Sequence, residues 1–256
     1  MFGLFSKKRQ NEIHSLDEEQ QKMIGGNLNF ASSEAYKLLR TNLTFSFTEE
    51  DTKRVIGVTS SLKGEGKSLT SINLAYTIAE TGKKVLLMEC DLRLPNIAKR
   101  LELEPTPGLS NLLVGLNTAS EVVQKGVLQT DLDVIVAGDL PPNASELLES
   151  SRMQYALEKL SEYYDYVILD LPPVTAVADA LVASKLTSGM VVVVRQDYAT
   201  RAALAETMRQ MQYANARVLG FVLNGVVDSE LPYQKRYYKY GYEYGYGYGE
   251  QRKDDG

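Results

Sequence analysis

The sequence predicts an α/β fold in which a mostly parallel sheet is flanked by helices on both faces. Apolar, strand-like runs alternate with amphipathic, helix-like segments along residues 55–223, and this alternation is typical of parallel sheets. A glycine-rich loop at residues 60–68 joins the first apolar run to the helix that follows it. The length of 256 residues suffices for one such domain with short appendages.

Composition and charge narrow the possible classes of function. The chain is 44% hydrophobic and 24% charged, which is ordinary for a globular protein. Its net charge of −5 argues against general nucleic-acid binding. A single cysteine, Cys90, excludes an internal disulfide framework. No apolar run approaches the roughly 20 residues of a membrane-spanning helix, and the first residues do not resemble a secretory signal. We therefore expect a cytoplasmic enzyme.

The N-terminal part of the chain is polar. Residues 1–29 are mixed in charge, and we expect a flexible segment there. Residues 32–46 are predicted to form a helix that begins at a capping serine, Ser32 or Ser33. Three charged residues of this helix recur at every third position and so lie on one side of it, namely Glu34, Lys37 and Arg40. They form either a solvated charged face or a contact with another subunit.

The loop at residues 60–68 has the features of a phosphate-binding loop. Gly64 and Gly66 allow backbone N–H groups to turn inward around phosphate oxygens. Lys67 can reach the terminal phosphates of a nucleotide, and the hydroxyl of Ser68 can bind Mg²⁺. Ser61 stands where the usual motif has its first glycine. The alternative is an ordinary glycine-rich turn between a strand and a helix.

Carboxylates follow two of the predicted strands. Glu89 and Asp91 stand two residues apart at the end of one strand, so we expect them on the same face. Asp170 ends another strand, before a proline turn. Ligands bind at the carboxyl ends of strands in such sheets, so these carboxylates are candidates for Mg²⁺ binding or for a general base. A structural role in capping a loop or helix is the alternative. Cys90 is expected in the core.

The remaining elements follow in order along the chain. The predicted strands cover residues 55–59, 85–88, 132–138, 166–170, 189–195 and 217–223. The predicted helices cover residues 69–79, several short segments within 96–125, and residues 145–148, 151–163, 175–184 and 200–213. Gly82 is suited to a left-handed helix end, Asn143 to a helix cap, and Asn224 closes the last strand at the ligand edge.

The C-terminal residues differ sharply in composition from the rest. Residues 233–256 contain eight tyrosines, five glycines and no aliphatic side chain. Such a segment cannot offset its own ordering entropy by burial, so we expect it to be flexible, with a span of about 25–30 Å. The tyrosines are Tyr233, Tyr237, Tyr238, Tyr240, Tyr242, Tyr244, Tyr246 and Tyr248. An edge strand is the alternative, although the glycines weaken it.

These features together resemble the bacterial tyrosine kinases, or BY-kinases, that control capsule and exopolysaccharide synthesis. Residues 64–68 match the Walker A core of that family, residues 86–93 look like its Walker A′ motif, and residues 167–173 look like its Walker B motif. The tyrosine cluster is similar to its autophosphorylation tail. The resemblance covers residues 30–248 and implies a P-loop NTPase fold. It divides the chain into residues 1–29, a kinase domain at 30–230 and a tail at 231–256.

The resemblance also implies a catalytic plan that uses ATP and Mg²⁺. Lys67 would bind the phosphates, Ser68, Asp91 and Asp170 would hold the metal, and Glu89 would help to remove the tyrosine proton. The residues implied in nucleotide binding are Lys63, Gly64, Glu65, Gly66, Lys67, Ser68, Leu69 and Asn224. The tail tyrosines would accept phosphate, and Glu34, Lys37 and Arg40 would contact a neighbouring subunit.

The resemblance implies partners as well. These are the cytosolic end of a membrane-bound activator of the polysaccharide co-polymerase type, further copies of the chain in an oligomer or ring, protein tyrosine substrates and a tyrosine phosphatase. The chain would be recruited to the inner face of the cell membrane. Three positions depart from the family pattern: Glu89 replaces an aspartate, Lys63 a proline and Lys37 an arginine. Two other functions stay open, a partitioning-type ATPase and a nonenzymatic nucleotide-dependent regulator.

Overall fold

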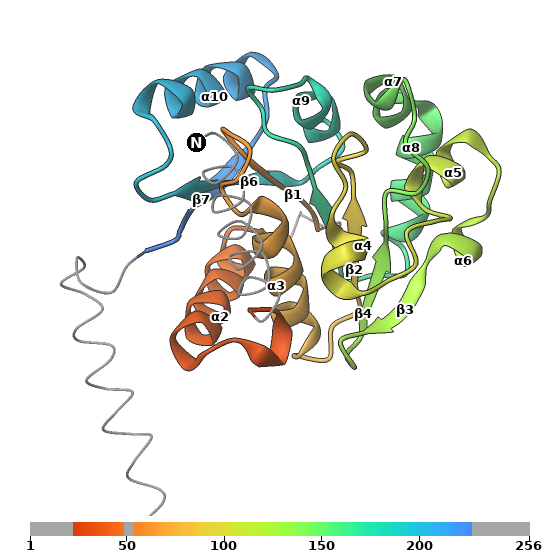
Figure 1. Ribbon diagram of the computed structural model, residues 1–256, viewed down its shortest axis with the longest axis horizontal. Helices are drawn as coiled ribbons and strands as arrows, with labels where there is room; N and C mark the ends of the chain where they lie inside the picture. Colours follow the sequence, from red (N-terminus) through yellow and green to blue (C-terminus); the bar gives the residue numbers. More distant parts are fainter. Residues whose placement is uncertain (1–22, 49–53, 227–256) are drawn as a thin grey trace, which may run out of the picture. The chain divides into compact units, whose positions relative to one another are not determined.

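The computed structural model describes residues 23–48 and 54–226, which contain one seven-stranded sheet (Figure 1). The strand order is β3-β4-β2-β5-β1-β6-β7, and only the β3–β4 pair is antiparallel. The strands are β1 (Val55–Ser60), β2 (Val85–Glu89), β3 (Gln124–Val127), β4 (Leu132–Ile135), β5 (Tyr166–Asp170), β6 (Gly189–Arg195) and β7 (Val218–Asn224). The predicted α/β class with a mostly parallel sheet is confirmed.

Helices connect the strands and cover both faces of the sheet. In Figure 1, α2 and α3 lie below the sheet, and α9 and α10 lie above it. The helices are η1 (Gly25–Asn27), α2 (Phe30–Phe45), α3 (Lys67–Ala79), α4 (Ile97–Leu101), α5 (Leu109–Val114), α6 (Ala119–Val122), α7 (Ala144–Glu149), α8 (Ser151–Leu160), α9 (Asp179–Ser184) and α10 (Arg201–Tyr213).

The central strands are apolar on both sides because each face meets a separate hydrophobic core. Along β2, Leu86 and Met88 join one buried cluster, and Val85 and Leu87 join the other. The first cluster also takes residues from α5, α7, α8, α9 and α10. The second takes residues from α2, α3 and α4. Alternate side chains of a strand point to opposite faces, so a continuous apolar run is what a doubly covered strand requires.

The parallel register brings the ends of five strands to one edge of the sheet. Glu89 at the end of β2 pairs with Asp170 at the end of β5, and Val58 of β1 pairs with the same Asp170. On the other side of β1, Arg195 of β6 pairs with Asn224 of β7. The phosphate loop leaves β1 at this edge, so residues far apart in the sequence meet around it.

Two helix predictions are wrong in detail. The first helix begins at Phe30, where the side chain of Asn29 accepts a hydrogen bond from the backbone N–H of Ser32 at 2.8 Å, so neither Ser32 nor Ser33 is the cap. Asparagine is as good a cap as serine, and it lies earlier. The helix predicted at 175–184 is confined to α9, because the hydroxyl of Thr175 donates to the Ser61 carbonyl and holds that part of the segment against the phosphate loop.

Two further local features differ from the prediction. The edge strand β3 was not predicted, because its short run is mostly polar and pairs only with β4. Asn143 precedes α7 as expected, but its side chain makes no capping hydrogen bond.

Two other local predictions are confirmed. Gly82 adopts the left-handed conformation, with φ of 75°, and Cys90 is fully buried in the core.

The chain divides into two compact units, Met1–Asn224 and Gly225–Gly256. Only residues 225 and 226 of the second unit are described, and the division of the chain at residues 30 and 230 stays a prediction.

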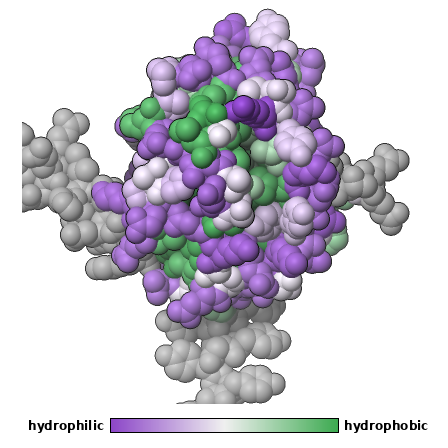
Figure 2. Space-filling view, turned by 90° about the vertical axis from the view of Figure 1, so that its right-hand side faces the viewer, coloured by the Kyte–Doolittle hydropathy of each residue, from purple (hydrophilic) through white to green (hydrophobic). Residues whose placement is uncertain are grey.

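None of the helices within residues 23–48 and 54–226 is long and apolar enough to cross a membrane. Figure 2 shows a face of the molecule on which hydrophilic side chains predominate and apolar ones form smaller patches.

Candidate active site

The phosphate loop owes its shape to two glycines. Gly64 and Gly66 have φ of 90° and 93°, a left-handed conformation that favours glycine. A Cβ atom on Gly66 would also lie 2.0 Å from the side-chain nitrogen of Asn224. A side chain at this position would strain the loop backbone and would force the Asn224 side chain to move. The two glycines therefore allow the loop to adopt this conformation. The helix α3 begins directly after Gly66, at Lys67.

Lys67 lies between two buried carboxylates. Its Nζ atom is 2.9 Å from Asp91 Oδ2 and 3.8 Å from Asp170 Oδ2. Burial alone would lower the pKa of Lys67, but the charges of Asp170 and Asp91 outweigh it and raise the pKa above its ordinary value of 10.5. The ammonium group is therefore charged at neutral pH, which is the state required to bind phosphate.

Asp170 has one oxygen without a hydrogen-bond partner among the described residues. Its Oδ1 atom accepts a hydrogen bond from the Ser71 hydroxyl at 3.1 Å, whereas the buried Oδ2 accepts none. Burial raises the pKa of Asp170 above 3.8, and the nearby Lys67 offsets part of this effect. Buried polar atoms normally have partners. An open carboxylate oxygen beside a phosphate loop fits a site for a metal ion or its bound water.

The predicted metal ligands meet at this place. Ser68 and Asp91 both lie at Lys67: the Ser68 Oγ and Asp91 Oδ2 atoms are 3.4 and 2.9 Å from its Nζ. The described residues contain no cluster of three or more His, Cys, Asp or Glu side chains that could hold a metal ion by themselves. Mg²⁺ commonly uses one or two carboxylates together with water and substrate phosphates. The residues present therefore fit a magnesium ion that arrives with a nucleotide.

Glu89 is engaged in a different way from the predicted base. Its Oε1 atom accepts hydrogen bonds from the backbone N–H groups of Asn96 at 2.5 Å and Ile97 at 2.6 Å, and Oε2 accepts one from Ala137 at 3.1 Å. Burial raises the pKa of Glu89, and the backbone hydrogen bonds counteract this. Because both oxygens bind backbone, this geometry favours the alternative, structural role: Glu89 anchors the segment that leads into α4.

The substitution Glu89→Gln separates the two roles. The new amide group must direct its NH₂ at a backbone N–H, so we expect the free energy of unfolding to fall by about 1–3 kcal/mol. This should lower the melting temperature by several degrees, as measured by circular dichroism, with the exposed Glu149→Gln as the control. A slower phosphoryl transfer with an unchanged melting temperature would instead support the predicted base.

The other residues predicted to bind the nucleotide surround the same loop. Lys63 and Gly64 lie in it, and Leu69 lies in the first turn of α3. Asn224 donates a hydrogen bond from Nδ2 to the Glu65 carbonyl at 2.8 Å. The structure thus brings the predicted nucleotide and metal residues together, although a direct contact of each with ATP stays a prediction. The tail tyrosines lie outside the described residues.

Sequence reasoning missed a buried acid next to the site. Asp179 is fully buried, its Oδ2 atom is 2.9 Å from Arg93 Nε, and its Oδ1 accepts a hydrogen bond from the Ser145 hydroxyl at 2.5 Å. These bonds tie the segment after Asp91 to α7 and α9. The position of Arg93 two residues after Asp91 was the available signal, but the sequence does not show which acid it meets.

The charged residues of α2 do not act alike. Glu34 and Lys37 form an exposed ion pair at 2.8 Å. Arg40 instead donates a hydrogen bond to the carbonyl of Thr77 at 2.7 Å and so joins α2 to the end of α3. A role of all three in subunit contact stays a prediction, and Arg40 has a structural task in addition.

We expect the charge reversals Glu34→Lys and Lys37→Glu, introduced one at a time, to dissociate an oligomer that uses this face. A single reversal places like charges opposite each other across the contact, whereas removal of an exposed pair would cost only about 0–1 kcal/mol. Light scattering measures the mass in solution. The same single reversals in the exposed pair Lys159–Glu162, whose Nζ and Oε1 atoms lie 3.0 Å apart, serve as the matched control. If the oligomer persists in each of the two single variants, this face of α2 is not the subunit contact.

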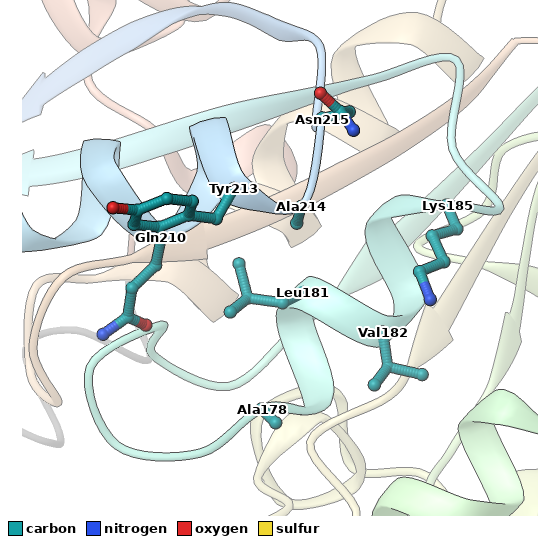
Figure 3. Close-up of a pocket in the computed structure, with 8 residues that line it drawn as sticks. All are labelled: Ala178, Leu181, Val182, Lys185, Gln210, Tyr213, Ala214 and Asn215. Carbon is teal, nitrogen blue, oxygen red and sulfur yellow. The ribbon is translucent and has the colours of Figure 1, made fainter.

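A separate pocket lies between α9 and α10. Figure 3 shows Leu181 and Val182 of α9 on one side and Gln210 and Tyr213 of α10 on the other. Its volume is about 460 Å³, and its lining residues are Ala178, Leu181, Val182, Lys185, Gln210, Tyr213, Ala214 and Asn215. None of the predicted site residues is among them, so the chemistry is assigned to the phosphate loop on the grounds of its charged groups and not of cavity size.

A glycine loop at the carboxyl edge of a parallel sheet, with a charged lysine between two buried carboxylates, defines a P-loop nucleotide-binding protein. The family model described as an AAA domain matches residues 53–219. The chain is 37% identical over 194 residues to the tyrosine-protein kinase YwqD of Bacillus subtilis, covering 76% of this chain and 81% of that protein. It is 33% identical over 206 residues to the putative tyrosine-protein kinase CapB of Staphylococcus aureus, covering 80% and 90%.

A solved structure supports the same assignment. The kinase domain of the Escherichia coli tyrosine kinase ETK matches with a TM-score of 0.76 and 32% identity, covering 82% of each chain. The chain belongs to the bacterial tyrosine kinases. The resemblance inferred from the Walker motifs and the tyrosine cluster is confirmed.

Proposed function

We propose that this chain transfers the terminal phosphoryl group of ATP to tyrosine side chains of proteins, including the tyrosines of its own C-terminal segment. The observation that carries the proposal is the charged Lys67 beside Asp91 and Asp170 at the phosphate loop, in a chain that belongs to the bacterial tyrosine kinases. Phosphoryl transfer depends mainly on positioning and charge stabilisation, and this site supplies fixed charges at the place where the phosphates would lie.

Each group of the site has a role in this proposal. Lys67 binds the terminal phosphates, and the backbone amides of the loop bind phosphate oxygens. The Ser68 hydroxyl and the carboxylates of Asp91 and Asp170 would hold Mg²⁺, a role that the open Oδ2 atom of Asp170 supports. Bound Mg²⁺ would neutralise phosphate charge during transfer. A tyrosine hydroxyl has a pKa of about 10, so it must lose its proton to a base during the reaction.

We further propose that the kinase regulates the synthesis and export of capsule or exopolysaccharide. The support is the resemblance in the Walker motifs and the tyrosine cluster. The same resemblance supports a membrane-bound activator of the polysaccharide co-polymerase type, recruitment to the cytoplasmic face of the membrane, a homo-oligomer, and a tyrosine phosphatase that reverses the reaction. The chain covers 81% of YwqD but 26% of the Escherichia coli kinase etk, so its relatives differ widely in length.

Incubation of the protein with ATP and Mg²⁺ tests the proposed reaction. We expect phosphotyrosine to form, as detected by mass spectrometry, and we expect none when EDTA removes the metal. Asp170→Asn is the matched variant, because it keeps the shape of the side chain and removes its charge. Hydrolysis of ATP without phosphotyrosine would favour a partitioning-type ATPase. Nucleotide binding without either reaction would favour a nonenzymatic regulator.

A further inference from the structure

Three consecutive backbone carbonyl groups of the phosphate loop accept hydrogen bonds from side chains that lie at or just after the ends of β6 and β7. The donors come from the end of β6, from the turn that follows it, and from the end of β7. The hydrogen bonds are Tyr198 Oη to Lys63 O at 2.9 Å, Arg195 Nη1 to Gly64 O at 3.1 Å and Asn224 Nδ2 to Glu65 O at 2.8 Å. We name these three side chains the carbonyl clamp.

The carbonyl clamp determines where the loop's amides point. In a planar trans peptide the C=O and the following N–H point in opposite directions. Fixing the carbonyls of residues 63, 64 and 65 outward therefore fixes the N–H groups of residues 64, 65 and 66 toward the other side. The N–H groups of Gly64 and Gly66 donate to no acceptor within the described residues. They are available to an anion held in the loop.

Further contacts connect Arg195 to Tyr198 and to the loop. The guanidinium of Arg195 lies 5.6 Å from the centre of the Tyr198 ring, within the range of a cation–π contact. The buried Glu65 carboxylate accepts a hydrogen bond from the backbone N–H of Leu62 at 2.7 Å and lies 3.5 Å from that of Arg195. Asp197 has φ of 57°, so the turn after β6 bends sharply before Tyr198.

We propose that Arg195 and Tyr198, together with Asn224, are positioning residues that preorganise the phosphate loop for the polyphosphate of a nucleotide. This rests on the proposed binding of ATP at the loop. The clamp lies on the carbonyl side of the loop, so it acts through the direction of the backbone amides. It should therefore strengthen binding of the phosphates whether or not a nucleoside is attached to them.

Two conservative variants test the inference. Tyr198→Phe removes one hydroxyl, and Arg195→Met keeps the length of the side chain but removes its donors. Isothermal titration calorimetry measures the dissociation constants of Mg²⁺–ATP and of inorganic tripolyphosphate. We expect each variant to weaken binding of both ligands by the same factor, about 3–10-fold, as is usual for the loss of one such hydrogen bond. Arg195→Lys, which can still donate to the Gly64 carbonyl, should recover part of the loss.

The controls distinguish a change in the loop from a general loss of stability and from direct contact with the nucleoside. Tyr163→Phe, at an exposed tyrosine elsewhere, should leave both constants unchanged. The melting temperature without ligand should stay near that of the wild type, while the increase caused by tripolyphosphate becomes smaller. Unchanged affinities in both variants would overturn the inference. So would a loss for ATP alone, because the side chains would then contact the nucleoside. Wild-type protein that binds neither ligand would instead refute the proposed function.

Discussion

Lys67→Met is expected to reduce the rate of phosphotyrosine formation by about 100-fold to 1,000-fold. A loss of this size is typical when a preorganised charge at a reacting centre is removed, and it would abolish the reaction in practice. The methionine keeps much of the volume of the side chain but carries no charge. Lys67 is the buried cation of the loop, and its Nζ atom lies within 4 Å of both Asp91 and Asp170. Mass spectrometry of the tail after incubation with ATP and Mg²⁺ measures the effect.

The same substitution should also lower stability. It leaves the buried Asp91 and Asp170 without their cation, and breaking a buried pair in this way costs up to about 3–5 kcal/mol. Without the cation the pKa of Asp170 rises further, so the loss should be fully developed at neutral pH and should shrink as the pH falls and the carboxyl protonates. The sequence alone predicts that the fold stays intact, and thermal unfolding at two pH values checks this.

Two control variants make the result interpretable. Lys67→Arg keeps the positive charge between the carboxylates and should retain more stability than Lys67→Met, while its different shape still impairs transfer. Lys185→Met changes an exposed lysine beside the separate pocket and should alter neither property. Phosphotyrosine at the wild-type level in a folded Lys67→Met protein would refute the assignment of this site.

Transfer of phosphate between chains is expected to account for the labelling of the C-terminal tyrosines. A chain that carries Lys67→Met and the complete tail is mixed with an active chain that ends after Leu231 and so lacks all eight tail tyrosines. We expect phosphate on the tail of the inactive chain, although that chain cannot catalyse the reaction. Each phosphate adds about −1.5 to −2 charges, so the modified tails should repel one another and favour disassembly of an oligomer.

Dilution provides the decisive control for transfer between chains. The rate of labelling should fall as the mixture is diluted, because two chains must meet. Each chain incubated alone should give no labelled tail. If only chains with both an active loop and their own tail become labelled, at every dilution, then transfer occurs within one chain and the prediction is wrong. Light scattering before and after labelling tests whether phosphorylation is coupled to disassembly.

Local patterns in the sequence determined most of the elements and the positions of the main charged residues, but not the short polar strand β3. A glycine loop between an apolar run and a helix indicated where Lys67 and Ser68 lie. Strands that end in acidic residues indicated Asp91 and Asp170, because parallel strands share one carboxyl edge. These inferences need only the period of the apolar residues and the order of the segments, and both are properties of short stretches of chain.

The tertiary structure alone decided which atoms these residues meet. Glu89 bonds to Ala137, which lies 48 positions along the chain, so its engagement depends on how two distant segments pack. The same is true of Tyr198, whose hydroxyl reaches the carbonyl of Lys63 across 135 positions. A sequence pattern places a side chain on a strand or helix. Its hydrogen-bond partners depend on the packing of those elements. This packing leaves one oxygen of Asp170 without a hydrogen bond, whereas both oxygens of Glu89 accept hydrogen bonds from the backbone.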